Sequence, residues 1–283
     1  MSDATLTGAS VGEGGDAGEG AFYRRDGDLF VPTRHTEGPW APETQAGNPV
    51  SALLAWGVEQ VPTLAPMRTV RCTFDLFRPS PMRPMELKTE VVREGKRIQV
   101  VDASLWVDGV RYAACRALRL RRGESGPPEL DNPVTGPLDM PPPPCRPMWD
   151  LDNMEGFPGA VKAFESKSVD SDDPRWSTSL WVRLRIPVIE GEPASAVARI
   201  AAVSDFVSNS VNHADREAWA MINADLNVAV FREPTSDWLA LTIRTGFSTD
   251  GVGHSVGWIQ DENGHVATAM TLGMVEPVSL ELP

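Results

Sequence analysis

Cysteine, positive charge and long hydrophobic runs are all scarce in this chain of 283 residues. Its three cysteines, Cys72, Cys115 and Cys145, are widely spaced without a Cys-X-X-Cys pair, so we expect reduced thiols and neither a metal site nor a disulfide framework. The formal net charge of −13 argues against binding to nucleic acid or to an anionic membrane surface, because both require clustered Lys and Arg. The sequence suggests no cofactor.

Two further absences concern location. No apolar run reaches the roughly 18 residues of a membrane span, and the N-terminus lacks the basic-then-apolar order of a signal peptide. We therefore expect a soluble cytoplasmic protein with no membrane partner.

What is present indicates two globular domains. Hydrophobic residues make up 41% of the chain, enough for a packed core. Residues 1–20 are Gly-rich and acidic and are typical of a flexible tail, and the Pro-rich residues 123–155 are typical of a linker. These breaks predict an N-terminal domain over 21–122 and a C-terminal domain over 156–283.

The N-terminal domain has a simple predicted order. Asp26-Gly27 marks a hairpin turn within 21–33, and apolar spacing predicts a helix over 50–61, with Asn48 as N-cap and Pro49 as its first residue. Residues 68–122 alternate in the manner of four antiparallel strands, with turns at Gly95-Lys96 and Asp108-Gly109.

The C-terminal domain repeats this order. Two strands are expected within 162–189, a helix over 195–213, and strands from 223 to 275. Three segments recur in register: FRP at 77–79 with FREP at 231–234, MELKTEVVR at 85–93 with WLALTIRT at 238–245, and VDGVRYAACRAL at 107–118 with ENGHVATAMTL at 262–272. The sequence thus predicts an α+β fold made of two tandem helix-wrapped antiparallel sheets.

Asp225 is the most informative candidate residue, since it opens a strand among apolar and small residues. A desolvated carboxylate can act as a general base, and the N-terminus of the first helix offers backbone N–H groups to a developing negative charge. The alternative is a strand-edge carboxylate that bonds the nearby backbone.

Three segments carry a family resemblance: GPWAPETQAGNPVSALLAW at 38–56, ARIAAVSDFVSNSV at 198–211 and NADLNVAVFREPTSDWLALTIRTGFSTDGVG at 223–253. With them the chain resembles the acyl-CoA thioesterase II group of double hotdog proteins over about residues 30–280. The resemblance implies hydrolysis of an acyl thioester such as acyl-CoA, with the acyl chain between the halves and with association into homo-oligomers.

Carried over by residue, the resemblance assigns the catalytic aspartate to Asp225 and its hydroxyl partner to Thr245. The family's glutamine falls on Thr271, a departure that shortens the reach of the side chain, and HGG in relatives is AGN at 46–48 here. We expect Gly47, Asn48, Trp56, Asp205 and Asn209 to bind substrate. Because Arg71 rather than Asp75 corresponds to Asp225, we expect one working site.

Two alternatives from other classes remain open. The departures at Thr271 and at residues 46–48 favour a related biosynthetic enzyme, an isomerase, cyclase or dehydratase. The nine tryptophans also suit a non-catalytic binder of acyl groups or other hydrophobic ligands.

Overall fold

A computed structural model describes residues 20–39, 41, 43–123, 158–169, 179–208 and 219–277. Most of the expected tail, most of the expected linker and the end of the expected second helix therefore lie outside the described residues.

The elements follow the predicted order in both halves. The first half comprises β1 (Tyr23–Asp26), β2 (Leu29–Pro32), the 3-10 turn η1 (Arg34–Thr36), α1 (Gly47–Glu59), β3 (Met67–Leu76), β4 (Met85–Arg93), β5 (Ile98–Val107) and β6 (Val110–Arg121). The second comprises α2 (Gly159–Lys162), β7 (Phe164–Ser168), β8 (Ser179–Leu184), α3 (Ala196–Ser204), β9 (Trp219–Asn223), β10 (Asp225–Val230), β11 (Leu239–Phe247), β12 (Val252–Asp261) and β13 (Gly264–Pro277).

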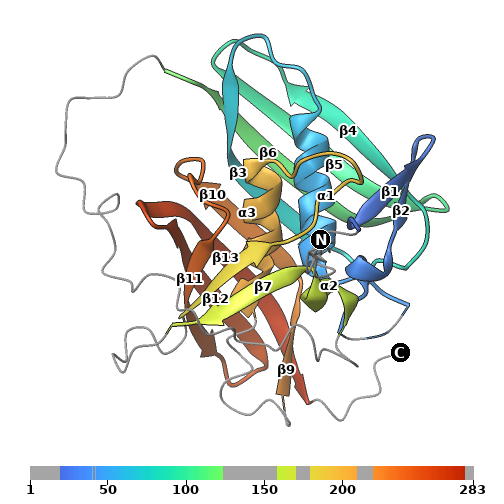
Figure 1. Ribbon diagram of the computed structural model, residues 1–283. Helices are drawn as coiled ribbons and strands as arrows, with labels where there is room; N and C mark the ends of the chain where they lie inside the picture. Colours follow the sequence, from blue (N-terminus) through green and yellow to red (C-terminus); the bar gives the residue numbers. More distant parts are fainter. Residues whose placement is uncertain are drawn as a thin grey trace, which may run out of the picture.

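One antiparallel sheet runs through both halves, in the order β1-β2-β4-β5-β6-β3-β10-β13-β12-β11-β8-β7, with β9 beside β13. The order is symmetric about the pair β3–β10, where Asp75 lies opposite Asp225 and Arg71 lies opposite Ala229. The two helices α1 and α3 lie side by side against the sheet (Figure 1). This arrangement confirms the predicted double hotdog fold.

The core lies between these helices and the inner face of the sheet. Leu53 and Leu54 of α1 and Ile200 of α3 are fully buried, each worth about 1.5–3 kcal/mol of burial free energy. Alanine lets the helices approach closely, and the buried alanines are Ala52, Ala55, Ala198, Ala201 and Ala202. Strand alternation places Leu226, Val228 and Val230 of β10 in the same core.

The helix boundaries differ from those predicted. Helix α1 begins at Gly47 with Ala46 as N-cap, and Asn48 lies inside the first turn. Asn48 does not cap because its Nδ2 donates to the Ala202 carbonyl oxygen of α3 at 2.8 Å. Helix α3 begins at Ala196 and ends at Ser204, followed by a 3-10 turn over 205–208. Strands β4 and β11 begin 154 residues apart in the sequence, at Met85 and Leu239. The starts of the two helices, Gly47 and Ala196, are not separated by this same number of residues.

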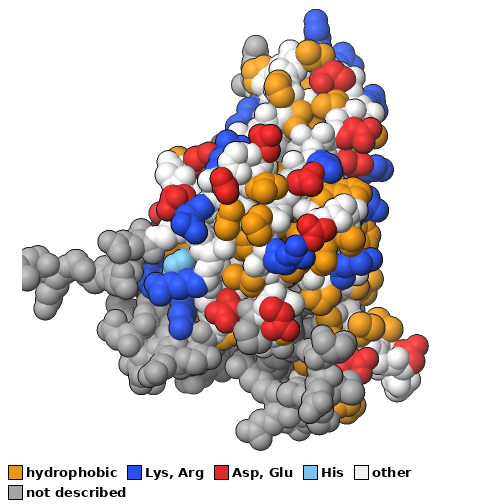
Figure 2. Space-filling view, turned by 90° about the vertical axis from the view of Figure 1, so that its right-hand side faces the viewer, with side chains coloured by type: hydrophobic (Ala, Val, Ile, Leu, Met, Phe, Trp, Pro, Cys, Tyr) orange, Lys and Arg blue, Asp and Glu red, His pale blue; other side chains and the backbone are white. Residues whose placement is uncertain are grey.

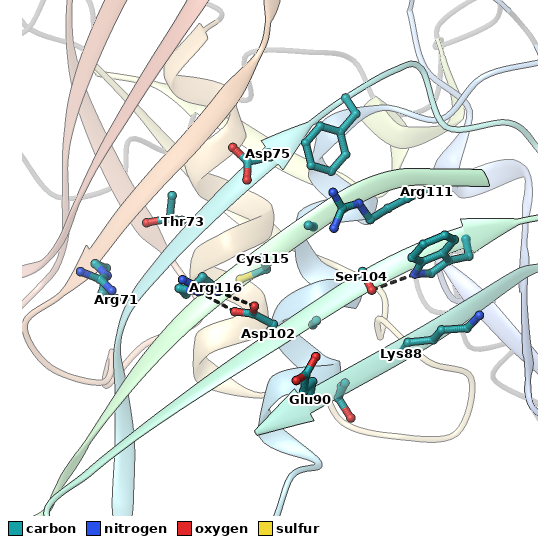
Figure 3. Close-up of a pocket in the computed structure, with 15 residues that line it drawn as sticks. Arg71, Thr73, Asp75, Lys88, Glu90, Asp102, Ser104, Arg111, Cys115 and Arg116 are labelled. Carbon is teal, nitrogen blue, oxygen red and sulfur yellow. Dashed lines mark hydrogen bonds and ion pairs between the residues drawn. The ribbon is translucent and has the colours of Figure 1, made fainter. Parts of the chain in front are cut away.

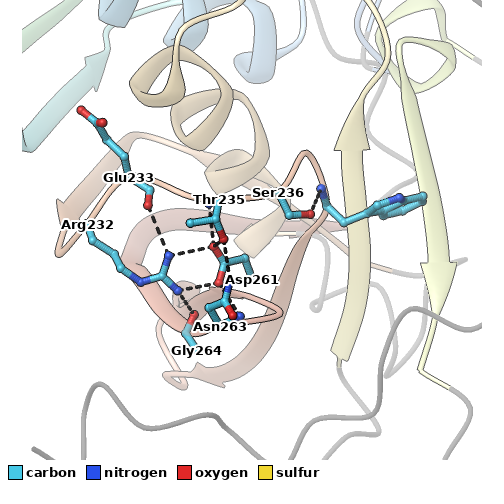
Figure 4. A network of polar contacts seen from close by, with 8 residues as sticks. Arg232, Glu233, Thr235, Ser236, Asp261, Asn263 and Gly264 are labelled. Carbon is cyan, nitrogen blue, oxygen red and sulfur yellow. Dashed lines mark hydrogen bonds and ion pairs between the residues drawn. The ribbon is translucent and has the colours of Figure 1, made fainter.

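An ion pair between Arg232 and the buried Asp261 joins two loops of the second half. Arg232 donates to Asp261 through both guanidinium nitrogens, at 2.7 and 2.5 Å, and to the Gly264 carbonyl oxygen at 2.9 Å (Figure 4). The backbone N–H groups of Thr235 and Asn263 donate to the same carboxylate. Because Asp261 is 3% exposed, this network ties the loop after β10 to the hairpin between β12 and β13.

The described surface carries both signs of charge. On the face in Figure 2, basic and acidic side chains alternate with hydrophobic ones and form no continuous basic field. Among the described helices, none is long and apolar enough to cross a membrane.

Candidate active site

A cleft of about 190 Å³ opens at the N-terminus of α1, where the two halves meet. The first half contributes the residues before and within the first helical turn, and the second half contributes the end of α3 and the end of β9. The residues used below are Gly47, Asn48, Arg78, Asp205 and Asn223. The N-cap residue, Ala46, makes no side-chain hydrogen bond to the helix, so the first turn has no cap from its own segment.

Asp205 places a buried carboxylate directly at this helix end. It follows the last residue of α3 and is 8% exposed. Burial raises its pKa from 3.8 to about 6, while hydrogen bonds from the Asn223 side chain and the Asn48 backbone N–H act in the opposite direction. A carboxylate with a pKa of about 6 is mostly ionised at neutral pH and is more basic than an exposed one.

Gly47 makes this approach possible. A Cβ atom at this position would lie 2.7 Å from Oδ1 of Asp205 and 2.8 Å from Oδ2, closer than real Cβ atoms approach. Gly47 is the only residue of the AGN segment that also occurs in the family's HGG pattern. It is the position at which the Asp205 carboxylate leaves no room for a Cβ atom.

Asn223 is a polar partner that the sequence analysis did not identify. Its Nδ2 donates to Oδ1 of Asp205 at 3.1 Å, and its own Oδ1 is buried without a partner among the described residues. A carboxylate oxygen only accepts, so the amide must turn its NH₂ toward Asp205 and leave its oxygen as a free acceptor. Asn223 ends β9 just before the bend at residue 224.

The pseudo-equivalent position in the other half holds no carboxylate. When the helix starts are aligned, Gly47 with Ala196, Trp56 takes the place of Asp205. The Trp56 indole donates to Glu192 at 3.0 Å and packs against Phe30, and Ser195 caps α3 by accepting from Ala198 N–H. Trp56, expected to bind substrate, thus lies outside the cleft.

The structure brings together Gly47, Asn48 and Asp205 of the predicted residues, but it does not bring Asp225 to them. Asp225 alternates with the buried Leu226, so its side chain lies on the outer face of the sheet. There its carboxylate accepts from Leu272 N–H and from Asn227 Nδ2, both at 2.7 Å. This is the backbone-bonded strand carboxylate that stood as the alternative interpretation.

The two predicted threonines lie on the opposite, inner face. Thr271 is fully buried and donates to the Asp225 carbonyl oxygen at 2.7 Å, and Thr245 shares a 2.8 Å hydrogen bond with Ser255. Neither lines the cleft at α1. Asn209 lies outside the described residues.

Within the described residues, the chain is a double hotdog protein with a buried carboxylate in a cleft between its halves. Family models for the N-terminal and C-terminal domains of acyl-CoA thioesterase match residues 36–121 and 137–275, and the chain therefore belongs to the acyl-CoA thioesterase family. A search of curated protein sequences finds no match.

Solved structures agree on the fold. A tesB protein of Mycobacterium avium subsp. paratuberculosis is 16% identical, over 89% of this chain and 95% of the other, with a TM-score of 0.66. The acyl-CoA thioesterase II TesB2 of Mycobacterium marinum is 16% identical, over 90% and 94%, with a TM-score of 0.61. A hotdog-fold protein of unknown function from Alicyclobacillus acidocaldarius is also 16% identical, over 89% and 94%, with a TM-score of 0.65.

Proposed function

We propose that this protein hydrolyses acyl-CoA thioesters, with Asp205 rather than Asp225 as the general base. One observation carries the proposal: a buried carboxylate with a raised pKa lies against a helix N-terminus whose own N-cap residue, Ala46, makes no side-chain hydrogen bond to it. Thioester hydrolysis needs a base for water and donors for the oxyanion, and these two features are the matching chemical groups.

Asp205 takes a proton from water while the water oxygen attacks the thioester carbon. The free Oδ1 of Asn223 accepts the second hydrogen of that water, because it lies beside the carboxylate and has no partner among the described residues. Two acceptors so placed aim the oxygen lone pair away from themselves and toward the substrate.

The first turn of α1 receives the thioester carbonyl. The Gly47 N–H of this turn and the helix dipole stabilise the negative charge on the tetrahedral intermediate, a role in which one donor is worth roughly 10²–10³ in kcat. Asn48 N–H already donates to Asp205, and Pro49 has no N–H. Collapse of the intermediate expels the thiolate of CoA, which takes up the proton held by Asp205. The carboxylic acid returns to its carboxylate, and the fatty acid leaves.

The test is thiol release from a panel of acyl-CoAs. We expect Asp205→Asn to lower kcat by about 100-fold or more, the contribution of a general base. Asp225→Asn is the matched control, since it makes the same chemical change on the outer face, and we expect kcat within about threefold of wild type.

The reverse pattern would return the base to Asp225 and contradict the proposal. No turnover with any acyl-CoA would refute hydrolysis of common acyl-CoAs. Tight acyl-CoA binding without turnover would then favour the binder, and an unrelated Asp205-dependent reaction would favour the biosynthetic enzyme.

A further inference from the structure

A second hollow, on the outer face of the first half, is lined by four cationic side chains and by the three carboxylates of Asp75, Glu90 and Asp102. It measures about 750 Å³ and lies over β3, β4, β5 and β6. Figure 3 shows Arg71, Lys88, Arg111 and Arg116 on this face. A volume of this order suits a ligand of nucleotide size.

The cations differ in how far they are already neutralised. Arg116 forms a bidentate pair with Asp102, and Lys88 pairs with Glu86 at 2.8 Å. Arg111 instead lies over the ring of Phe77, 4.7 Å from its centroid, and forms no ion pair with the described residues. Arg78 lies 5.8 Å from the centroid of Tyr112 and likewise forms no ion pair within the described chain.

Aromatic surface accompanies the guanidinium groups of Arg78 and Arg111. Phe77 is 46% exposed although it is a large apolar residue, and Trp106 also lines the hollow. An exposed ring beside a guanidinium is a good platform for a purine base, because stacking on a ring is worth about 1–3 kcal/mol per base. A free guanidinium next to it suits phosphate.

The hollow meets the cleft of Asp205 at one turn of the chain. Phe77 lines the hollow and the next residue, Arg78, lines the cleft together with Leu76. The Phe77 backbone N–H donates to the Tyr112 carbonyl oxygen at 3.0 Å, which fixes this turn to the start of β6. A ligand that leaves the cleft over Arg78 therefore reaches Arg111 and Phe77 next.

We propose that this turn is the binding site for the nucleotide part of CoA, with the diphosphate at Arg78, the 3′-phosphate at Arg111 and the adenine on the exposed ring of Phe77. The proposal rests on the proposed function, in that the pantetheine arm then runs from the cleft of Asp205 across Arg78. It commits to CoA rather than to an acidic carrier protein, because a carrier protein presents no purine to the ring.

The first experiment is calorimetric titration with CoA and with adenosine 3′,5′-bisphosphate, neither of which is hydrolysed. We expect Arg78→Ala and Arg111→Ala each to weaken CoA binding about tenfold, as expected for the loss of a charged hydrogen bond. Arg97→Ala is the matched control, an exposed arginine at the distant β4–β5 turn, and should bind CoA like wild type.

The second experiment separates this site from catalysis. Arg111→Ala should raise KM about tenfold for an acyl-CoA and leave KM unchanged for the same acyl group on N-acetylcysteamine, which lacks the nucleotide. Equal CoA affinity in wild type and Arg111→Ala would overturn the site even if hydrolysis is efficient. If the protein hydrolyses the N-acetylcysteamine ester but binds no CoA, the nucleotide site is overturned. The proposed thioesterase function would then remain intact. CoA binding that depends on Arg111, in a protein that hydrolyses no thioester, would support the site while the proposed function fails.

Discussion

Asp205→Asn should make the protein more stable at neutral pH while it removes activity. The folded protein raises the pKa of this carboxyl from 3.8 to about 6, so folded molecules bind more protons than unfolded ones between these values. The contribution of this carboxyl group to the free energy of unfolding is therefore greatest below about pH 4. It decreases as the pH rises to about 6 and stays low at higher pH. Asparagine cannot ionise and avoids that loss.

The magnitude follows from the shift. A difference of about two units corresponds to about 3 kcal/mol of destabilisation of wild type at pH 7.5. The amide offers one acceptor where the carboxylate offers two, so one of the donors, Asn48 N–H or Asn223 Nδ2, loses its bond at a cost of about 1 kcal/mol. The net gain is about 2 kcal/mol, or roughly 4 °C in Tm for a chain of this size.

Thermal unfolding of wild type and Asp205→Asn at pH 7.5 and pH 4.5 measures this difference. We expect the variant to have the higher Tm at pH 7.5 and most of the advantage to vanish at pH 4.5, where the wild-type carboxyl is protonated. Asp225→Asn should show no such gain, because its carboxylate is partly exposed and accepts from Leu272 N–H. A lower Tm for Asp205→Asn at both pH values would refute the conclusion that burial of the ionised Asp205 carboxylate destabilises the fold.

Three further changes test the surroundings of the site. Gly47→Ala puts a Cβ atom against the Asp205 carboxylate, so kcat/KM for an acyl-CoA should fall at least tenfold while circular dichroism shows the native fold; unchanged kinetics would contradict the contact. Asn223→Ala removes the water acceptor and should lower kcat about 10-fold or more with KM little changed; a pure KM effect would instead make Asn223 a substrate contact. Arg232→Met leaves Asp261 buried without its partner and should lower the free energy of unfolding, measured in urea, by about 3–5 kcal/mol, whereas a loss below 1 kcal/mol would show that the pair is not structural.

The fold could be predicted because its signals are local and occur twice. Turn residues such as Asp26-Gly27 and Asp108-Gly109 separate strands with period-two alternation, and both glycines have the positive φ that such turns require, 59° and 76°. Duplication then identifies the partner of each strand, since β4, β5 and β6 recur as β11, β12 and β13.

The placement of Asp225 and Asp205 could have been predicted from the same patterns. Alternation with Leu226 and Val228 already sends Asp225 to the outer face of the sheet. Asp205 lies seven residues after Ala198 and four after Ala201, on the helix face that packs against α1. Asn223 was beyond prediction, because its position depends on the bend at residue 224 and on pairing of β9 with β13, where Asn223 lies opposite Gly273.

The dependence of kcat/KM on pH in the wild-type protein tests the central claim most directly. Measured by thiol release from an acyl-CoA between pH 4.5 and 8.5, kcat/KM should be constant above about pH 7 and fall tenfold per unit below about pH 6, where Asp205 takes up its proton. The residual kcat/KM of Asp205→Asn should not show this decrease below about pH 6. A wild-type profile that stays flat down to pH 4.5 would contradict a base with a raised pKa and with it the catalytic role of Asp205.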